Sequence, residues 1–315
     1  MYDLIGDIHG YADPLVRLLR RLGYAERDGT WGHPDRQVIF LGDFVDRGPA
    51  QRETLVIVRH MVNAGRAQAV MGNHEFNAVA WASVDPVRQA EYLRPHSAKN
   101  RQQHQAFLTQ LEEGSAAHRD AIEWFKSLPL YLDLDGLRVV HACWHPLYLA
   151  QLQPYLDDRQ RILPDAWPAL TAEGSLAFRA LETVLKGLEV PLPEGVHYAD
   201  KDGHLRNHIR TRWWSQHLTY RDLAMAPAEV IASLPHTPVP EDVLPGYDGE
   251  KPLFVGHYWL SGTPAPLSRS IACLDYSIAA NDPLTGKGPG KLCAYRWQGE
   301  RELTAEHFVW VEQPS

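Results

Sequence analysis

The sequence predicts an α/β protein, and three short apolar segments in its N-terminal part carry that prediction. Residues 4–5, 38–41 and 69–71 each have the composition of a buried strand, and each is followed directly by a glycine and a polar residue. Helix-patterned stretches separate the three segments. Connections this short favour parallel neighbours, because a helical crossover returns the chain to the same edge of the sheet. Residues 1–82 are therefore predicted to form a βαβαβ unit.

The two helices of this unit have recognisable ends. Asp13 can act as the N-cap of the first helix with Pro14 at its first position, leucines follow at helical spacing, and Gly23 supplies a stop. The second helix is expected over residues 49–64, where Pro49 can open it and an apolar face follows.

The middle of the chain is expected to contain the first of two helical insertions. Residues 83–128 are polar and lack strand alternation, and helices are expected over residues 97–112 and 116–127. Strand patterning returns at residues 130–134 and 137–140, which are joined by an Asp-Gly pair typical of a hairpin.

A second helical insertion is expected over residues 146–250, with helices near residues 174–188 and 207–218 between proline-rich loops. The remaining part is patterned as strand. Its strands are expected at residues 253–255, 271–276, 292–297 and 307–311. We expect residues 1–315 to form a single domain that carries these two insertions.

Composition limits the classes of protein that fit. Of the 315 residues, 44% are hydrophobic and 22% charged, which is ordinary for a domain with its own core. The net charge of -8 gives no overall attraction to nucleic acid or an anionic membrane, although a local basic groove for nucleic acid is compatible with it. Three cysteines without CxxC spacing argue against a disulfide framework and a thiolate zinc site. Since no basic leader or membrane-length apolar stretch occurs, a cytoplasmic protein without membrane partners is expected.

Polar side chains at the predicted strand ends have the character of metal ligands. Asp7 and His9 lie two residues apart on an extended segment and therefore point the same way. Asp43 has two oxygens and can bridge two cations, and an amide oxygen with two later imidazoles can complete the second site. Such a mixed oxygen and nitrogen set suits Mn, Fe or Zn better than Ca or a lone Mg. The predicted ligands of two divalent metal ions, with Mn preferred and Fe or Zn as alternatives, are Asp7, His9, Asp43, Asn73, His141 and His257.

The same motifs offer the remaining parts of a phosphoester hydrolysis. Two divalent ions about 3.5–4 Å apart lower the pKa of a bridging water, so that a hydroxide held between them can attack phosphorus in line. Arg47 offers a planar fork for phosphate oxygens. His74 follows a ligand directly and is the candidate general acid, and Asp46 can orient it and raise its pKa. The predicted catalytic residues are His74, Asp46 and Arg47.

The order of these motifs resembles that of the calcineurin-like metallophosphoesterases. The chain has GDIHG at residues 6–10, GDFVDRG at residues 42–48 and GNHE at residues 72–75, followed by a strand that ends in His141 and by Gly-His at residues 256–257. The DRG and GNHE forms are similar to the phosphoprotein phosphatase branch, which holds Ser/Thr protein phosphatases and bacterial diadenosine tetraphosphate hydrolases. The resemblance implies a βαβαβ two-sheet sandwich flanked by helices, with a dinuclear metal site and the ligand and acid–base roles given above.

After residue 82 the resemblance rests on single positions, and the sequence departs from the family pattern at two of them. Tyr258 and Trp259 follow Gly-His where the family often has Thr, and Cys143 stands where Gly is common; neither change removes a ligand. The resemblance also implies a second phosphate-binding arginine before the last histidine. Arg212 is the candidate and Arg210 is its neighbouring alternative. The predicted substrate-binding residues are Arg47, Asn73 and Arg212.

The expected function is hydrolysis of phosphomonoesters or nucleoside polyphosphates, with phosphoproteins, nucleotides and other phosphorylated small molecules all open as substrates. An aromatic-rich insertion would favour a nucleotide and a shallow groove a phosphoprotein. Action on nucleic-acid ends or cyclic phosphates is an alternative that needs a basic groove. A binding protein on an inactive scaffold is disfavoured, because no ligand, acid or arginine position is missing. The other histidines, His104 and His145 among them, are expected to be surface or structural, and the sequence has no signal for oligomeric state.

Overall fold

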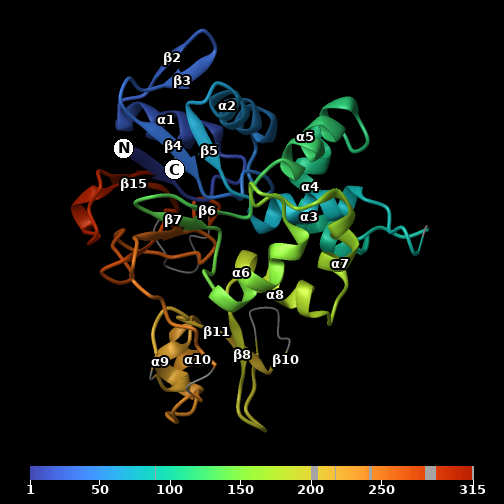
Figure 1. Ribbon diagram of the computed structural model, residues 1–315, viewed down its shortest axis with the longest axis vertical. Helices are drawn as coiled ribbons and strands as arrows, with labels where there is room; N and C mark the ends of the chain where they lie inside the picture. The colour runs from blue at the N-terminus through green and yellow to red at the C-terminus, as the bar shows by residue number, and fades with distance from the viewer. Residues whose placement is uncertain (89, 200–204, 217, 241–242, 281–288, 314–315) are drawn as a thin grey trace.

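Two β-sheets form the centre of the protein in a computed structural model that describes residues 1–88, 90–199, 205–216, 218–240, 243–280 and 289–313 (Figure 1). The first sheet has six strands in the order β14-β15-β1-β4-β5, with β16 paired to β15. The second has four strands in the order β13-β12-β7-β6. Helices lie around both sheets. The α/β class predicted from the sequence is confirmed.

The predicted βαβαβ unit lies in the first sheet. Strands β1 (Tyr2–Ile5), β4 (Gln37–Phe40) and β5 (Ala67–Ala69) run parallel to one another. Helices α1 (Ala12–Leu22) and α2 (Gln51–Asn63) connect them. Because the three strands are parallel, their carboxyl ends meet at one edge of the sheet, which is where the sequence motifs follow.

The two helix starts differ from those expected. The N-cap of α1 is Tyr11, so Asp13 lies inside the first turn, where its charge suits the helix dipole. Gly23 ends α1 in the left-handed conformation, as expected. Helix α2 begins at Gln51, two residues after Pro49, because the preceding turn is held by other bonds: the Gln51 side chain accepts from the Asp46 backbone N–H and donates to the carbonyl of Gly48.

The C-terminal strands complete both sheets. Strand β15 (Lys291–Trp297) pairs antiparallel with β1, and β16 (Phe308–Glu312) and β14 (Asp275–Tyr276) pair antiparallel with β15. The single strand expected over residues 271–276 is split. Its first half is β13 (Ile271–Cys273) of the second sheet and its second half is β14 of the first, so the chain crosses from one sheet to the other at Leu274.

The second sheet contains the expected hairpin. Strands β6 (Tyr131–Asp133) and β7 (Arg138–Val140) pair antiparallel, and β12 (Leu253–Val255) pairs parallel with both β7 and β13. The carboxyl ends of β7 and β12 therefore lie side by side, and His141 and His257 follow them.

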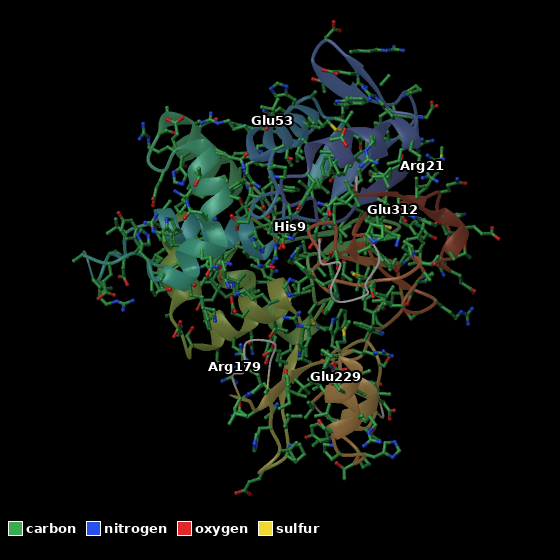
Figure 2. All side chains as sticks on the ribbon, turned by 180° about the vertical axis from the view of Figure 1, so that it is seen from behind. His9, Arg21, Glu53, Arg179, Glu229 and Glu312 are labelled. Carbon is green, nitrogen blue, oxygen red and sulfur yellow. The ribbon has the colours of Figure 1, made fainter. Side chains whose placement is uncertain are left out.

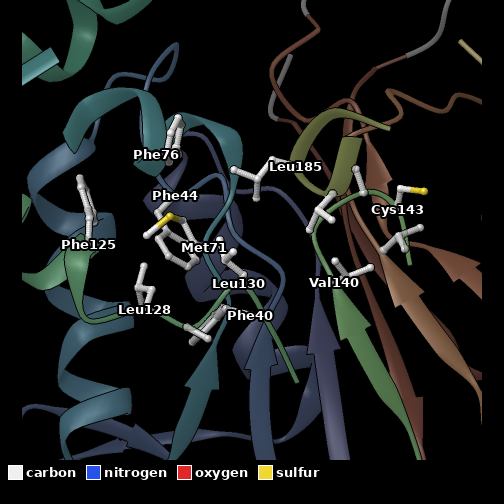
Figure 3. Close-up of a cluster of buried hydrophobic side chains, with 14 of the residues drawn as sticks. Phe40, Phe44, Met71, Phe76, Phe125, Leu128, Leu130, Val140, Cys143 and Leu185 are labelled. Carbon is white, nitrogen blue, oxygen red and sulfur yellow. The ribbon is translucent and has the colours of Figure 1, made fainter. Parts of the chain in front are cut away.

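Strand alternation in β4 divides the core into two parts. Ile39 packs in a cluster with Val139 and Phe254 of the second sheet, whereas Phe40 belongs to the larger cluster that includes the helices. Figure 3 shows Phe40 and Phe44 in that larger cluster with Met71, Phe76 and Leu130. Both faces of β4 are buried, which explains the continuous apolar run in the sequence. The three cysteines, Cys143, Cys273 and Cys293, are free and fully buried.

The residues expected to form the first insertion contain helices at the two stretches where helices were expected. After α3 (Asn73–Ala82) come α4 (Ala98–Leu111) and α5 (Ala116–Lys126), which start at serine N-caps that accept hydrogen bonds from backbone N–H groups. Helix α4 packs on α2, and α5 packs on α3. The insertion therefore lies directly beside the motif-bearing turns.

Residues 146–250 contain helices and also strands that the sequence analysis did not predict. The helix expected over residues 207–218 is wrong: residues 208–210 form a strand, and residue 217 lies outside the described residues. Ile209 and Thr211, two residues apart, are both buried, as expected for one face of a strand, and residues 208–210 pair with β8. The helices are α6 (Pro146–Leu152), α7 (Trp167–Thr171), α8 (Leu176–Lys186), α9 (Tyr220–Leu223) and α10 (Ala228–Ser233), with 3-10 turns at Gln153–Tyr155 and Pro164–Ala166. The strands are β8 (Glu189–Pro191), β9 (Tyr198–Ala199), β10 (Leu205–Arg206) and β11 (His208–Arg210).

These strands and helices α9 and α10 lie at the end of the molecule opposite the hairpin of β2 (Ala25–Arg27) and β3 (Thr30–Gly32) (Figure 1). A last 3-10 turn, Ala305–His307, precedes β16. No helix within the described parts of the chain is both long and apolar enough to cross a membrane.

Candidate dinuclear metal centre

The turns that follow the strands of both sheets bring the predicted ligands to one place. His9 follows β1, Asp43 follows β4, Asn73 begins α3, and His141 and His257 follow β7 and β12. Figure 2 shows His9 near the middle of the molecule. Several of these turns hold non-glycine residues at positive φ, which costs about 1–3 kcal/mol each and persists only where the surroundings enforce it. They are His9, Asp43, Asp46, Arg47, His257 and Trp259.

The carboxylate of Asp43 lies at the centre of the cluster. Its Oδ2 is 3.8 Å from His9 Nε2 and 3.4 Å from His141 Nε2. The amide oxygen of Asn73 is 3.2 Å from His141 Nε2 and 2.8 Å from His257 Nδ1. Two groups that could hold a metal ion share Asp43. One consists of His9, Asp43 and His74, and the other of Asp43, His141 and His257.

Asp7 lies beside this cluster. It is buried and accepts a hydrogen bond from the backbone N–H of His257 at 3.1 Å. Gly256 leaves room for it, since a Cβ there would lie 2.2 Å from Asp7 Oδ1. Burial, followed by the charge of Asp275, raises the pKa of Asp7 well above its usual range. Asp275, which sequence analysis did not single out, therefore adds a further buried carboxyl group close to the cluster.

The hydrogen bonds of the histidines test whether the residues fit a metal ion. His9 Nδ1 lies 3.0 Å from the carbonyl of Val45, and His141 Nδ1 lies 2.7 Å from that of Leu41. A carbonyl only accepts, so both Nδ1 atoms carry a hydrogen, and each Nε2 is the nitrogen that can bind either a proton or a metal ion. His9 Nε2 is buried without a partner among the described residues. Since His141 Nε2 faces the acceptor oxygens of Asn73 and Asp43, these groups together fit a cation between them.

The pKa shifts of His141 and His9 are consistent with a cation bound beside Asp43. Burial disfavours a charged His141, but Asp43 outweighs burial and raises the pKa of His141 to about 10. Either a proton or a metal ion can supply that charge. Burial, with help from the charge of His74, lowers the pKa of His9 to about 3, so its imidazole is neutral and ready to bind a metal ion.

His74 and Asp46 form a close pair. His74 Nδ1 lies 2.5 Å from Asp46 Oδ2, and His74 Nε2 lies 3.9 Å from Asp43 Oδ2 on the side of the candidate ligands. Burial opposes a charged His74, but the charges of Asp43 and Asp46 outweigh it and raise the pKa of His74. Glu75 holds the adjoining turns together by accepting from the backbone N–H groups of Asp43 and Phe44, both at 2.8 Å.

Arg47 is held by an aromatic ring that sequence analysis missed. Its guanidinium carbon lies 4.1 Å from the centre of the Trp259 ring, and the same ring lies 6.3 Å from that of His9. Such a cation–π contact orients the planar fork of an arginine beside the cluster. Trp259 follows Tyr258 within the segment that departs from the family pattern, so no motif pointed to it.

The two candidates for a second phosphate-binding arginine differ in position. The side chain of Arg212 is exposed. Arg210 lies near the cluster, because its charge, after burial, is the largest cause that lowers the pKa of His257. Arg210 also lines a cavity of about 370 Å³, and its Nη2 lies 3.9 Å from Glu189 Oε1 there. The other lining residues are Arg206, Asn207, His208, Tyr198 and Met225.

One buried histidine outside the motifs also contacts the site. His104 Nδ1 lies 2.7 Å from Asp46 Oδ1. The sequence led us to expect a surface or structural histidine here, and this contact with Asp46 was not predicted. A signal for burial was present, since residues 104, 107, 108 and 111 recur at helical spacing, but nothing in the sequence identifies Asp46 as the partner.

A family model described as calcineurin-like phosphoesterase matches residues 2–257 of the chain. The chain belongs to the calcineurin-like phosphoesterases. Among curated relatives of this calcineurin-like phosphoesterase, bis(5'-nucleosyl)-tetraphosphatase PrpE [asymmetrical] of Bacillus velezensis is 34% identical over 144 residues, which are 45% of this chain and 55% of the relative. The symmetrical bis(5'-nucleosyl)-tetraphosphatase of Vibrio cholerae is 28% identical over 210 residues, 61% of this chain and 68% of the relative.

The chain spans about half the length of the first curated relatives that it matches. A solved structure of a cold-active protein-tyrosine phosphatase from a psychrophilic Shewanella has 17% sequence identity and a TM-score of 0.47, covering 93% of this chain and 74% of the other.

Proposed function

We propose that the protein is a metal-dependent phosphoesterase that hydrolyses nucleoside polyphosphates of the diadenosine tetraphosphate type. The observation that carries the proposal is the convergence of two ligand groups on Asp43 beside the pair of His74 and Asp46. A metal-activated nucleophile and a general acid can together hydrolyse a phosphoester, and candidate residues for both lie within a few ångströms of Asp43.

The proposed roles follow from the contacts. When bound, two divalent ions, with Mn preferred over Fe and Zn, supply a hydroxide nucleophile at neutral pH and offset charge on the phosphate. Asp7, His9, Asp43, Asn73, His141 and His257 hold them. His74 protonates the leaving oxygen while Asp46 holds its imidazole by Nδ1. Arg47, oriented by Trp259, binds the phosphate.

Two observations support a nucleotide as the substrate. The curated relatives cited above carry the name bis(5'-nucleosyl)-tetraphosphatase. In addition, the cavity beside Arg210 combines the side chains of Arg206 and His208 with the larger, less polar surfaces of Tyr198 and Met225; its one carboxylate, Glu189, is paired with Arg210. Such a lining suits further phosphates and a nucleobase. Arg210, rather than the Arg212 expected from the sequence, is the proposed second phosphate-binding arginine.

The test compares substrates on protein stripped of metal and reloaded. Diadenosine tetraphosphate, a phosphoserine peptide, p-nitrophenyl phosphate and a cyclic nucleotide are each assayed with and without added Mn. We expect Mn to switch on hydrolysis and kcat/KM to be highest for diadenosine tetraphosphate. Absence of Mn-stimulated turnover on every substrate would reject the enzyme, and a preference for the peptide or the cyclic nucleotide would reject the nucleotide assignment.

A matched pair of variants tests the arginine. Arg210→Ala should raise the KM for diadenosine tetraphosphate by about 10-fold or more, because a charge-assisted contact to phosphate is worth roughly 1.5–3 kcal/mol. Arg212→Ala removes the same charge two residues away and should leave this KM near the wild-type value. The reverse result would restore Arg212 as the phosphate ligand.

A further inference from the structure

The carboxylate of Asp46 is shared by two imidazoles. Its Oδ2 bonds to His74 Nδ1 at 2.5 Å and its Oδ1 bonds to His104 Nδ1 at 2.7 Å. The backbone N–H of the same residue donates to the side chain of Gln51 at 2.8 Å. Both oxygens and the backbone of Asp46 are therefore engaged, and its carboxylate cannot rotate without breaking one of these bonds.

His104 comes from the first insertion rather than from the motif-bearing turns. It lies on α4 and is fully buried, with its ring 4.8 Å from that of Phe107 and 6.1 Å from that of Trp81. Its Nε2 has no partner among the described residues, so the bond to Asp46 is the polar contact that offsets burial of the imidazole. A leucine would pack among these rings without the cost of burying a polar imidazole. The hydrogen bond to Asp46 therefore explains why a histidine stands here.

We propose that His104 is a positioning residue for the reaction at the metal centre. By donating from Nδ1 to one oxygen of Asp46, it fixes the carboxylate plane so that the other oxygen holds His74 with Nε2 turned toward the leaving group. A general acid works only within a narrow range of distance and angle, so loss of this support lowers proton transfer more than substrate binding. The inference rests on the proposed function, since it assigns His104 to the same acid pair.

The chain offers a matched control in His118. That histidine lies on α5, is also buried, and its ring lies 5.4 Å from the same Phe107 ring. Among the described residues, Asp46 is hydrogen-bonded to His74, His104 and Gln51 and not to His118. His104→Leu and His118→Leu therefore remove the same group from the same aromatic cluster. His104→Asn keeps a donor near the position of Nδ1 and is the conservative variant.

The experiment measures kcat and KM on p-nitrophenyl phosphate, whose leaving group needs little protonation, and on phenyl phosphate, whose leaving group needs more. For His104→Leu we expect kcat on phenyl phosphate to fall about 10-fold or more, the size typical when a partner that orients a functional imidazole is removed. We expect KM and the rate on p-nitrophenyl phosphate to stay near wild type. His104→Asn should restore most of the lost kcat, and His118→Leu should leave the ratio of the two rates unchanged.

A spectroscopic measurement covers the case in which His104→Leu does not fold. In ¹⁵N-histidine-labelled protein loaded with diamagnetic zinc, the bond predicts a downfield Nδ1–H resonance that disappears in His104→Asn and persists in His118→Leu. The inference is overturned if that resonance is absent, if His104→Leu slows both substrates equally, or if His118→Leu reproduces its pattern. A wild-type enzyme that turns over neither these two substrates nor diadenosine tetraphosphate with any metal overturns the proposed function itself and, with it, this inference.

Discussion

His74 illustrates how neighbours define the task of a single residue at this site. Its Nδ1 is bonded to Asp46, so the nitrogen left facing the Asp43 cluster is Nε2. The two carboxylates raise its pKa although burial opposes the charged form. The raised pKa favours the protonated imidazole, which is the form that an acid requires before the leaving group departs.

Replacing His74 should expose this role through the leaving group. Asn at this position removes the titrating group and keeps a polar side chain, so hydrolysis of an alkyl phosphate should slow by about 10²–10⁴-fold, the usual contribution of a general acid. Hydrolysis of p-nitrophenyl phosphate should slow far less. The measurement is kcat on both substrates, and equal losses would show that His74 does not donate the proton.

At the scale of an element, the turn before α3 sets the geometry of Asp43. Gly72 is the N-cap of α3, and a Cβ at this glycine would lie 2.2 Å from Asp43 Oδ1 and 2.4 Å from the Asp43 backbone nitrogen. The Glu75 side chain accepts from the backbone N–H of Gly72 at 3.0 Å and that of Asp43 at 2.8 Å. The ends of β4 and β5 are thus pressed together with no room for a side chain.

Gly72→Ala should therefore displace the carboxylate of Asp43. We expect a loss of about 1–3 kcal/mol in the free energy of unfolding, the usual cost of an overpacked site, together with weaker metal binding. Urea denaturation and metal titration measure the two effects. Gly32→Ala is the matched control, because the nearest atom to its added Cβ is 3.6 Å away on the side chain of Arg66. A fully stable Gly72→Ala variant with wild-type metal affinity would contradict the expectation.

The elements that could be predicted are those whose structure is determined by the pattern of neighbouring residues in the sequence. β4 reads as a buried strand because both faces are apolar, and its motif turn lies where a parallel strand ends. The helix expected near β11 was wrong because pairing with β8, a tertiary contact, decides that segment. His104 and Trp259 were missed for the same reason: each acts through a partner distant in sequence, Asp46 and Arg47 respectively.

At the scale of the whole molecule, the candidate ligands come from both sheets. Asp7, His9 and Asp43 follow strands of the first sheet, whereas His141 and His257 follow strands of the second. A cation bound among them would link the two sheets in the folded state, and the unfolded chain would not reproduce that site.

Metal ions should consequently stabilise the protein against heat. At a free metal concentration of 100 times Kd, the expected gain is about 2.7 kcal/mol, which a thermal melt detects as a rise in Tm over metal-free protein. His141→Ala should lose most of the metal-induced rise, whatever its effect on the metal-free Tm. A rise of equal size in His141→Ala would argue that the stabilising ion binds elsewhere.

The burial of the three free cysteines determines how they react under oxidising conditions. All three sulfur atoms are buried: Cys273 lies on β13, Cys293 on β15, and Cys143 shortly after β7. Burial raises the pKa of all three thiols. Peroxide reacts with thiolates that it can reach, and these are neither ionised nor within reach. Oxidation of these three cysteines must therefore wait until the sheets separate, so an oxidised cysteine marks a molecule that has already unfolded.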